Sequence, residues 1–142
     1  MSADGFFADS SSTLIESLLN ALREDDGLKS VLGDPVRLFD DESQQPHYPY
    51  AVLERFESTD MSSSLVSSFE HQLQFATFSR YGGLREAKAL LGRLRDTLER
   101  AAPVLTQQRI VLIIPTYCDV MRTQNQQIFR GVLRVRIHTE EI

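Results

Sequence analysis

The sequence predicts an α+β fold in which a mainly antiparallel, four-stranded sheet carries helices on one face. Apolar side chains alternate with polar ones from Phe69 to Ser79, which is the spacing of a strand. After Gly82-Gly83 the leucines recur every three or four residues, which is the spacing of a helix. Alternation returns from Ile128 to Thr139. The predicted order of helix, strand, strand, helix, strand, strand is typical of such a sandwich.

Length, composition and charge restrict the class of protein. A chain of 142 residues with 42% hydrophobic residues is typical of one soluble globular domain. Fifteen basic and twenty acidic residues give a net charge of -5, so nucleic acid or an anionic membrane would not attract the whole chain. The N-terminal segment lacks the basic and apolar regions of a signal peptide, and no apolar run could span a bilayer. We therefore expect a protein of cytoplasmic origin.

The N-terminus is predicted to be a flexible arm, residues 1–11, ahead of a single domain at 12–142. The arm is small, polar and acidic apart from Phe6 and Phe7. Because two adjacent phenylalanines are too apolar for a simple spacer, we expect them to dock on a neighbouring molecule.

The first predicted helix starts where Ser12 or Thr13 can cap it, and it ends at Gly27. Its apolar stripe consists of Ile15, Leu18, Leu19 and Leu22. A short helical turn at 28–32 and a brief extended piece at 36–39 follow. A polar loop containing two prolines leads on to the first long strand.

Two strands, Tyr50–Ser58 and Phe69–Ser79, are predicted to pair as antiparallel neighbours. In the second strand one face carries His71, Leu73, Phe75 and Thr77. The connecting loop, 58–68, has five serines after residue 60 and no turn motif. Because such a segment buries little surface, we expect it to be mobile in the free chain and to become ordered on a partner.

The second long helix is predicted from Leu84 to about Ala101, before Pro103. Its apolar stripe consists of Leu84, Ala87, Leu91, Leu94 and Leu98. The strand at 109–121 is uniformly apolar from Ile110 to Ile114, which predicts a central or doubly covered strand. Pro115 predicts a bulge or an edge segment at that point.

No set of residues in the sequence indicates catalysis or a bound metal, so we expect neither an enzyme nor a cofactor. The three histidines, His47, His71 and His138, lack metal-binding spacing and are predicted to be structural or exposed. Cys118 is predicted to be a buried, inert thiol, and Asp40-Asp41-Glu42 a solvated turn. Gly82-Gly83 lacks the lysine and hydroxyl of a phosphate loop, which favours a simple tight turn.

A row of cationic side chains is the strongest electrostatic feature of the sequence. Alternation places four of them on one face of the last strand: Arg130, Arg134, Arg136 and His138. They could meet phosphates or an acidic partner. The favoured interpretation is that the arginines pair across the sheet with Glu54, Glu57, Glu70 and neighbouring glutamines.

Three stretches carry a family resemblance that extends over about residues 14–140. They are Tyr48-Pro49-Tyr50 with Val52-Leu53, Phe78-Ser79-Arg80 with the glycine turn and Glu86-Ala87-Lys88, and Gly131-Val132-Leu133-Arg134. In this pattern the chain resembles the small tail-completion, or tail-terminator, family of long-tailed phages and gene transfer agents. The phenylalanine-containing arm and the serine-rich loop extend beyond the family pattern.

The resemblance implies a structural protein of the virion or gene-transfer-agent particle, assembled in the bacterial cytoplasm. Such proteins form six-fold rings that cap the head-proximal end of the tail tube, stop its polymerisation and join it to the neck. The implied partners are further copies of the chain, the tail tube protein and a neck or head-completion protein, while DNA passes through without specific binding. The candidate assembly residues are Phe6, Phe7, Ser62, Ser63, Ser64, Leu65, Arg130, Arg134 and Arg136.

Two alternatives stay open at this point. The chain could be another head–tail connector or neck protein. It could instead be a small nucleic-acid-binding module that uses the arginines of the last strand, in which case added salt would abolish its binding.

Overall fold

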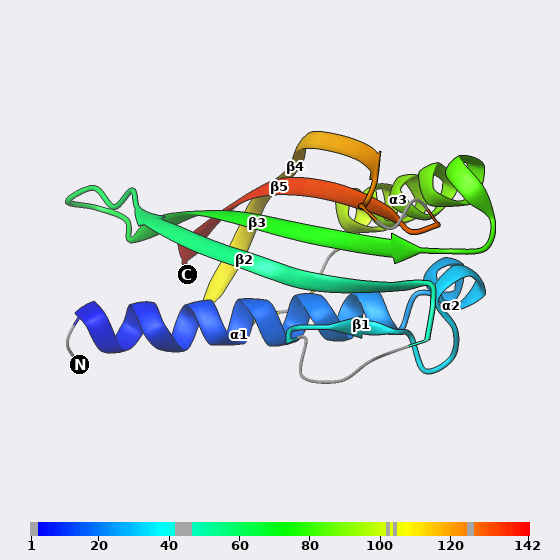
Figure 1. Cartoon of the computed structure of the whole chain (residues 1–142). Helices are drawn as coiled ribbons and strands as arrows, with labels where there is room; N and C mark the ends of the chain where they lie inside the picture. The colour runs from blue at the N-terminus through cyan, green and yellow to red at the C-terminus, as the bar shows by residue number, and fades with distance from the viewer. Residues whose placement is uncertain (1–2, 42–46, 102, 104, 125–126) are drawn as a thin grey trace.

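The computed structural model describes residues 3–41, 47–101, 103, 105–124 and 127–142, and within them an α+β fold of three helices and five strands (Figure 1). In chain order the elements are α1 (Ala3–Arg23), α2 (Asp26–Leu32), β1 (Leu38–Phe39), β2 (Tyr50–Asp60), β3 (Ser68–Ser79), α3 (Gly83–Arg100), β4 (Gln108–Arg122) and β5 (Phe129–Glu141).

The strands form one mixed sheet in the order β1-β2-β3-β5-β4. The antiparallel pairing of β2, β3, β5 and β4 confirms the predicted four-stranded core of the sheet. The brief extended piece predicted at 36–39 contains β1, which pairs parallel to β2 with Leu38 opposite Ala51 and is a fifth strand that the predicted sheet did not include. Two residues are too few to show the alternation that would have placed this piece in the sheet.

All three helices pack on the same face of the sheet and share one hydrophobic core. Among the fully buried core side chains are Leu14, Leu18, Leu22, Leu28, Leu94, Leu98, Phe75, Leu133 and Ile137. Arg23 near the end of α1 donates two hydrogen bonds to the carbonyl oxygen of Leu38, at 2.8 and 3.2 Å. This contact ties α1 to the edge of the sheet.

The first helix is longer than predicted. It begins at Ala3, so Ser12 and Thr13 lie inside it rather than at its cap. Serine costs a helix interior only a few tenths of a kcal/mol relative to better helix formers, so a serine run can continue a helix as well as begin one. Independent movement of residues 1–11 stays a prediction.

A bulge in β2 changes which residues face the core. Leu53 lies opposite Phe75 and Arg55 lies opposite Gln74, so Glu54 is an extra residue in the strand. Because of this extra residue, Arg55 lies on the outer face with Glu54, whereas strict alternation places neighbouring residues of a strand on opposite faces. Beyond the bulge, Phe56 packs against the core.

The β2–β3 hairpin ends in a defined tip, residues 61–67, that is shorter than the predicted loop. Serine side chains make the hydrogen bonds that form this turn, although the sequence contains no turn motif here. The Ser62 hydroxyl accepts from the Ser68 amide at 3.0 Å, and the Ser63 hydroxyl accepts from the amides of Leu65 and Val66 at 3.3 and 3.2 Å. Such serine turns are built by local hydrogen bonds. The mobility of this segment in the free chain stays a prediction.

Helix α3 starts directly after the glycine turn, where Gly83 adopts a φ of 69° that favours glycine. Five α3 side chains face the core in addition to Ala87: Leu90, Leu91, Leu94, Thr97 and Leu98. Leu84, predicted to belong to this stripe, is 44% exposed instead. Beneath the helix, a Cβ at Gly131 would lie 3.2 Å from a Leu91 methyl and closer still to Thr77, so this glycine lets the helix approach β5.

The position of β4 differs from its prediction. It is an edge strand, paired only with β5 among the described residues, and it is half-exposed rather than doubly covered. The predicted irregularity at Pro115 is confirmed by a register shift between Pro115 and Tyr117. A second shift lies between Ile110 and Leu112. The five apolar residues from Ile110 to Ile114 therefore belong to an edge strand with bulges and not to a buried strand.

Candidate assembly interface

The outer face of the sheet, opposite the helices, carries a network of paired charges. Arg130 donates to both carboxylate oxygens of Glu54, one of them at 3.1 Å. Gln74 donates to the same carboxylate at 2.7 Å and accepts from Arg134 at 2.9 Å. Burial opposes ionisation of Glu54, but hydrogen bonds from Arg130 and Gln74 and the Arg130 charge outweigh it and hold the pKa of the carboxyl below its usual value.

Two further arginines of this face pair with carboxylates, and Arg134 also contacts an aromatic ring. Arg136 lies 3.4 Å from a Glu70 oxygen, and Arg55 bonds Glu57 on its own strand. The guanidinium of Arg134 lies 4.8 Å from the centre of the Tyr117 ring, a cation–π contact with β4. The predicted pairing of the arginine row is thus confirmed with Glu54, Glu70 and Gln74, whereas Glu57 pairs elsewhere.

A shallow hollow of about 370 Å³ lies in the middle of this face. Its charged lining combines both signs: Arg55, Arg134 and Arg136 with Glu57 and Glu70. Because Glu57 and Glu70 offset the charges of Arg55 and Arg136, this hollow offers no concentrated positive charge to a phosphate. It is a complementary polar surface, of the kind that meets another protein with matched charges.

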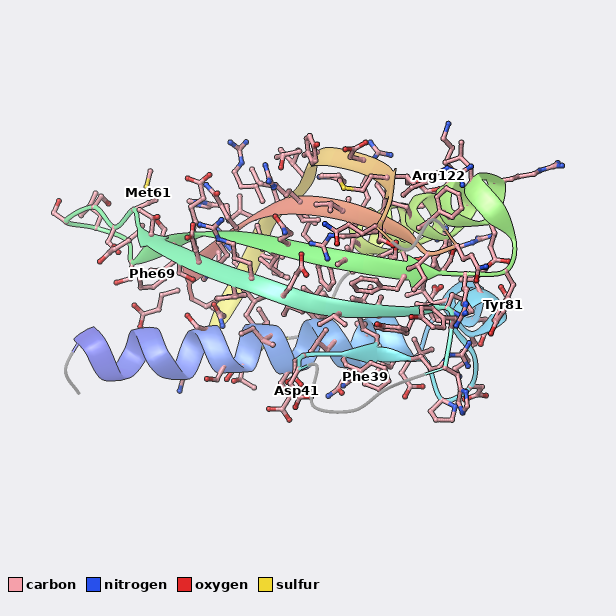
Figure 2. The ribbon with its side chains drawn as sticks, in the orientation of Figure 1. Phe39, Asp41, Met61, Phe69, Tyr81 and Arg122 are labelled. Atoms are coloured by element: carbon pink, nitrogen blue, oxygen red, sulfur yellow. The ribbon has the colours of Figure 1, made fainter. Side chains whose placement is uncertain are left out.

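The outer face becomes aromatic at the end near the β3–α3 turn. The rings of Tyr50 and Phe78 stack at 4.9 Å, and Tyr48 lies 5.5 Å from Tyr50. Arg80 lies over Tyr48 and over Tyr81, which is 80% exposed. Figure 2 shows Tyr81 and Arg122 at this end of the molecule and Met61 at the opposite end, on the hairpin tip.

Strand β4 presents an open edge with apolar side chains. Four large hydrophobic residues of this strand are exposed: Val111, Ile114, Tyr117 and Met121. A long edge strand with exposed apolar side chains tends to pair with another chain. The sequence prediction missed this surface because it had assigned the apolar run to the core.

The titratable side chains show no catalytic arrangement in the described residues, and no cluster of metal-ligating side chains occurs among them. His71 is buried, as predicted for a structural histidine, and its two ring nitrogens lie 2.6 Å from the Ser58 hydroxyl and 2.8 Å from the Thr139 hydroxyl. Cys118, predicted to be buried, is exposed on the edge strand. Partial desolvation raises the pKa of its thiol, with Arg95 opposing the rise, so the thiolate is disfavoured. In the described ranges no helix is both long and apolar enough to cross a membrane.

The structure places the predicted assembly residues in three separate regions. Arg130, Arg134 and Arg136 lie together on the outer face of β5. The residues from Ser62 to Leu65 lie at the hairpin tip, where Leu65 is 92% exposed. Phe6 and Phe7 lie in the first turns of α1, but their side chains fall outside the described part of the structure, so their docking stays a prediction.

Comparisons with known proteins agree on the architecture. One chain in the solved structure of the virion of a native gene transfer agent (GTA) particle superposes on this chain with a TM-score of 0.80. The two sequences are 22% identical. The match covers 91% of this chain and 96% of that chain, so the two share their whole fold. No curated protein matches the chain.

The sequence itself supports a closer assignment. The family model of Tail completion protein gp17 matches residues 16–140, which include β1 to β4, α2 and α3 in full and β5 except for Glu141. The chain therefore belongs to the family of Tail completion protein gp17.

Proposed function

We propose that this tail completion protein caps the head-proximal end of the tail tube, ends its polymerisation and joins the tail to the neck. It acts as a ring of identical subunits, six-fold as in the tail terminators that the sequence resembles. The particle is a phage or a gene transfer agent, and the similarity in fold to a gene-transfer-agent virion chain supports this placement.

The open, apolar edge of β4 is the observation that carries the proposal. A lone subunit with such an edge risks uncontrolled association, whereas a closed ring covers one surface of each subunit with its neighbour. The paired charges of the outer face also suit contacts with proteins more than contacts with phosphates. DNA would then pass through the ring without a tight grip, as the net charge of -5 also favours.

Deletion of the gene in cells that produce the particle tests this proposal. We expect filled heads separate from tails, and tails of variable, excess length, because nothing stops tube growth. Electron microscopy of the lysate measures both, and wild-type protein supplied in trans should restore joined particles. Joined particles with tails of normal length in the deletion strain would refute the proposed role.

Replacing Arg134 by alanine separates the structural role from nucleic-acid binding. The substitution removes the hydrogen bond to Gln74 and the contact with Tyr117. We expect fewer joined particles, with no change in the weak retention of duplex DNA by the purified protein across a salt series. Tight, salt-sensitive DNA binding that this variant loses while it still assembles would favour the nucleic-acid module instead.

A further inference from the structure

A groove runs between α3 and the edge strand β4, on the helix side of the sheet. Its volume is about 590 Å³. The lining consists of Leu84, Lys88, Leu91, Gly92 and Arg95 from α3 and of Cys118, Asp119 and Val120 from β4. Its floor is apolar, and its charged rim carries two cations and one anion.

Gly92 lies in the middle of α3, where glycine is among the least favourable residues for a helix. No heavy atom beyond its chain neighbours and its own helix backbone lies within 4 Å of a Cβ built at this position. The fold of the subunit therefore gives no packing reason for a glycine here. A glycine on the groove floor leaves space for a side chain from another molecule.

The hairpin tip has the shape and chemistry to enter such a groove. Leu65 is 92% exposed, and Met61 and Val66 are 52% and 41% exposed. The hydrogen bonds of Ser62 and Ser63 define the conformation in which the tip presents these side chains. Among the acidic residues of the hairpin, Glu57 and Glu70 pair with Arg55 and Arg136, whereas Asp60 lies exposed at the base of the tip. An exposed anion beside an apolar end thus complements an apolar groove bordered by Lys88 and Arg95.

Tip and groove lie at opposite ends of the subunit. Figure 1 shows the β2–β3 hairpin projecting at one end, with α3 at the other. A contact between two different surfaces of identical subunits is heterologous, and it closes into a ring when the rotation allows. A tip that joined two copies symmetrically would produce only dimers.

We propose that the hairpin tip of one copy docks in the α3–β4 groove of the next copy, with Leu65 over Gly92. This inference rests on the proposed ring and names the contact that builds it. Because β4 forms one wall of the groove, the docked hairpin also lies beside the open edge of the sheet.

Filling the groove provides the first test. Gly92→Leu should keep or raise the melting temperature, because leucine favours a helix and the site has space. It should lower the yield of joined particles at least tenfold, whereas Gly92→Ala should lower it far less. Wild-type yield from Gly92→Leu would overturn the inference. Gly92→Leu subunits that still form rings but no longer bind tails would also overturn the inference, because the groove would then hold another protein of the particle.

Disulfide trapping identifies the partner directly. Leu65→Cys places a thiol at the tip, and the native Cys118 already lies in the groove as the chain's one cysteine. Oxidation of purified particles should give a ladder of this chain beyond dimers on a non-reducing gel. The same variant with Cys118→Ser should stop at dimers, and Asp40→Cys with native Cys118 should give no ladder. Joined particles that give no ladder would refute this contact but not the capping role. The deletion experiment tests the capping role separately.

Discussion

Replacing Leu94 by alanine is expected to lower the free energy of unfolding by about 3–5 kcal/mol, in the upper part of the range for buried leucines. Leu94 is 0% exposed and sits in the core where α3 covers the sheet. The substitution removes buried methyl groups and leaves a cavity that surrounding helices and strands can close only in part. Chemical denaturation of the purified protein, followed by circular dichroism, measures the change.

Two other leucines of α3 serve as matched controls. Leu91 is 4% exposed but borders the open groove, so water or relaxation can fill the space, and Leu91→Ala should cost about 2 kcal/mol. Leu84 is 44% exposed, and Leu84→Ala should change stability by less than about 0.5 kcal/mol. Equal losses at all three positions would contradict the packing of α3 on the sheet.

The difference between Leu84 and Leu94 shows where sequence periodicity stops being informative. Spacing of three and four residues correctly predicted α3 and the side of it that packs. It could not predict where along the helix the sheet ends, because that depends on contacts made by other elements. Leu84 lies in the first turn, beside the groove, and so escapes burial.

Strand β4 shows a similar limit for apolar runs. A sequence from Ile110 to Ile114 without polar residues is equally compatible with burial on both faces and with an edge that a partner covers. Only the strand order, with β5 between β3 and β4, distinguishes the two. A local sequence pattern cannot encode that order, and the exposed edge strand was therefore predicted to be core.

The pairing of Arg130 with Glu54 and of Arg136 with Glu70 was predicted correctly because it depended on alternation and on charges in neighbouring strands. Register places Arg136 beside Gln72 and Arg134 beside Gln74, within reach of carboxylates on the same face. The bulge at Glu54 was not predicted, yet it lets Glu54 and Arg55 lie on the same face as the row. A bulge depends on pairing with another strand, and composition did not reveal it.

His71 connects three strands beneath the hairpin that carries the proposed docking tip. It lies on β3, and its ring bonds the hydroxyls of Ser58 on β2 and Thr139 on β5. The side chain is fully buried. Desolvation by burial, with a smaller contribution from the nearby His138, lowers the pKa of His71 to about 4 from an ordinary 6.5.

This shift makes the stability of the subunit depend on pH. The unfolded chain binds a proton at His71 near pH 6.5, whereas the folded chain binds it only near pH 4. Between these values the unfolded state holds more protons, so the free energy of unfolding falls as the pH falls. The loss attributable to His71 should begin below pH 6.5, approach about 3 kcal/mol and level off near pH 4.

Urea denaturation at a series of pH values, for the wild type and for His71→Gln, isolates this contribution. The variant should be less stable at pH 7, because glutamine cannot reproduce both ring contacts. Its decline from pH 7 to pH 4 should be smaller than that of the wild type by about 3 kcal/mol, since carboxylates contribute equally to both proteins. If His71→Gln declined in parallel with the wild type, His71 would take up its proton equally in the folded and unfolded chains. That result would contradict the buried position of His71 between Ser58 and Thr139.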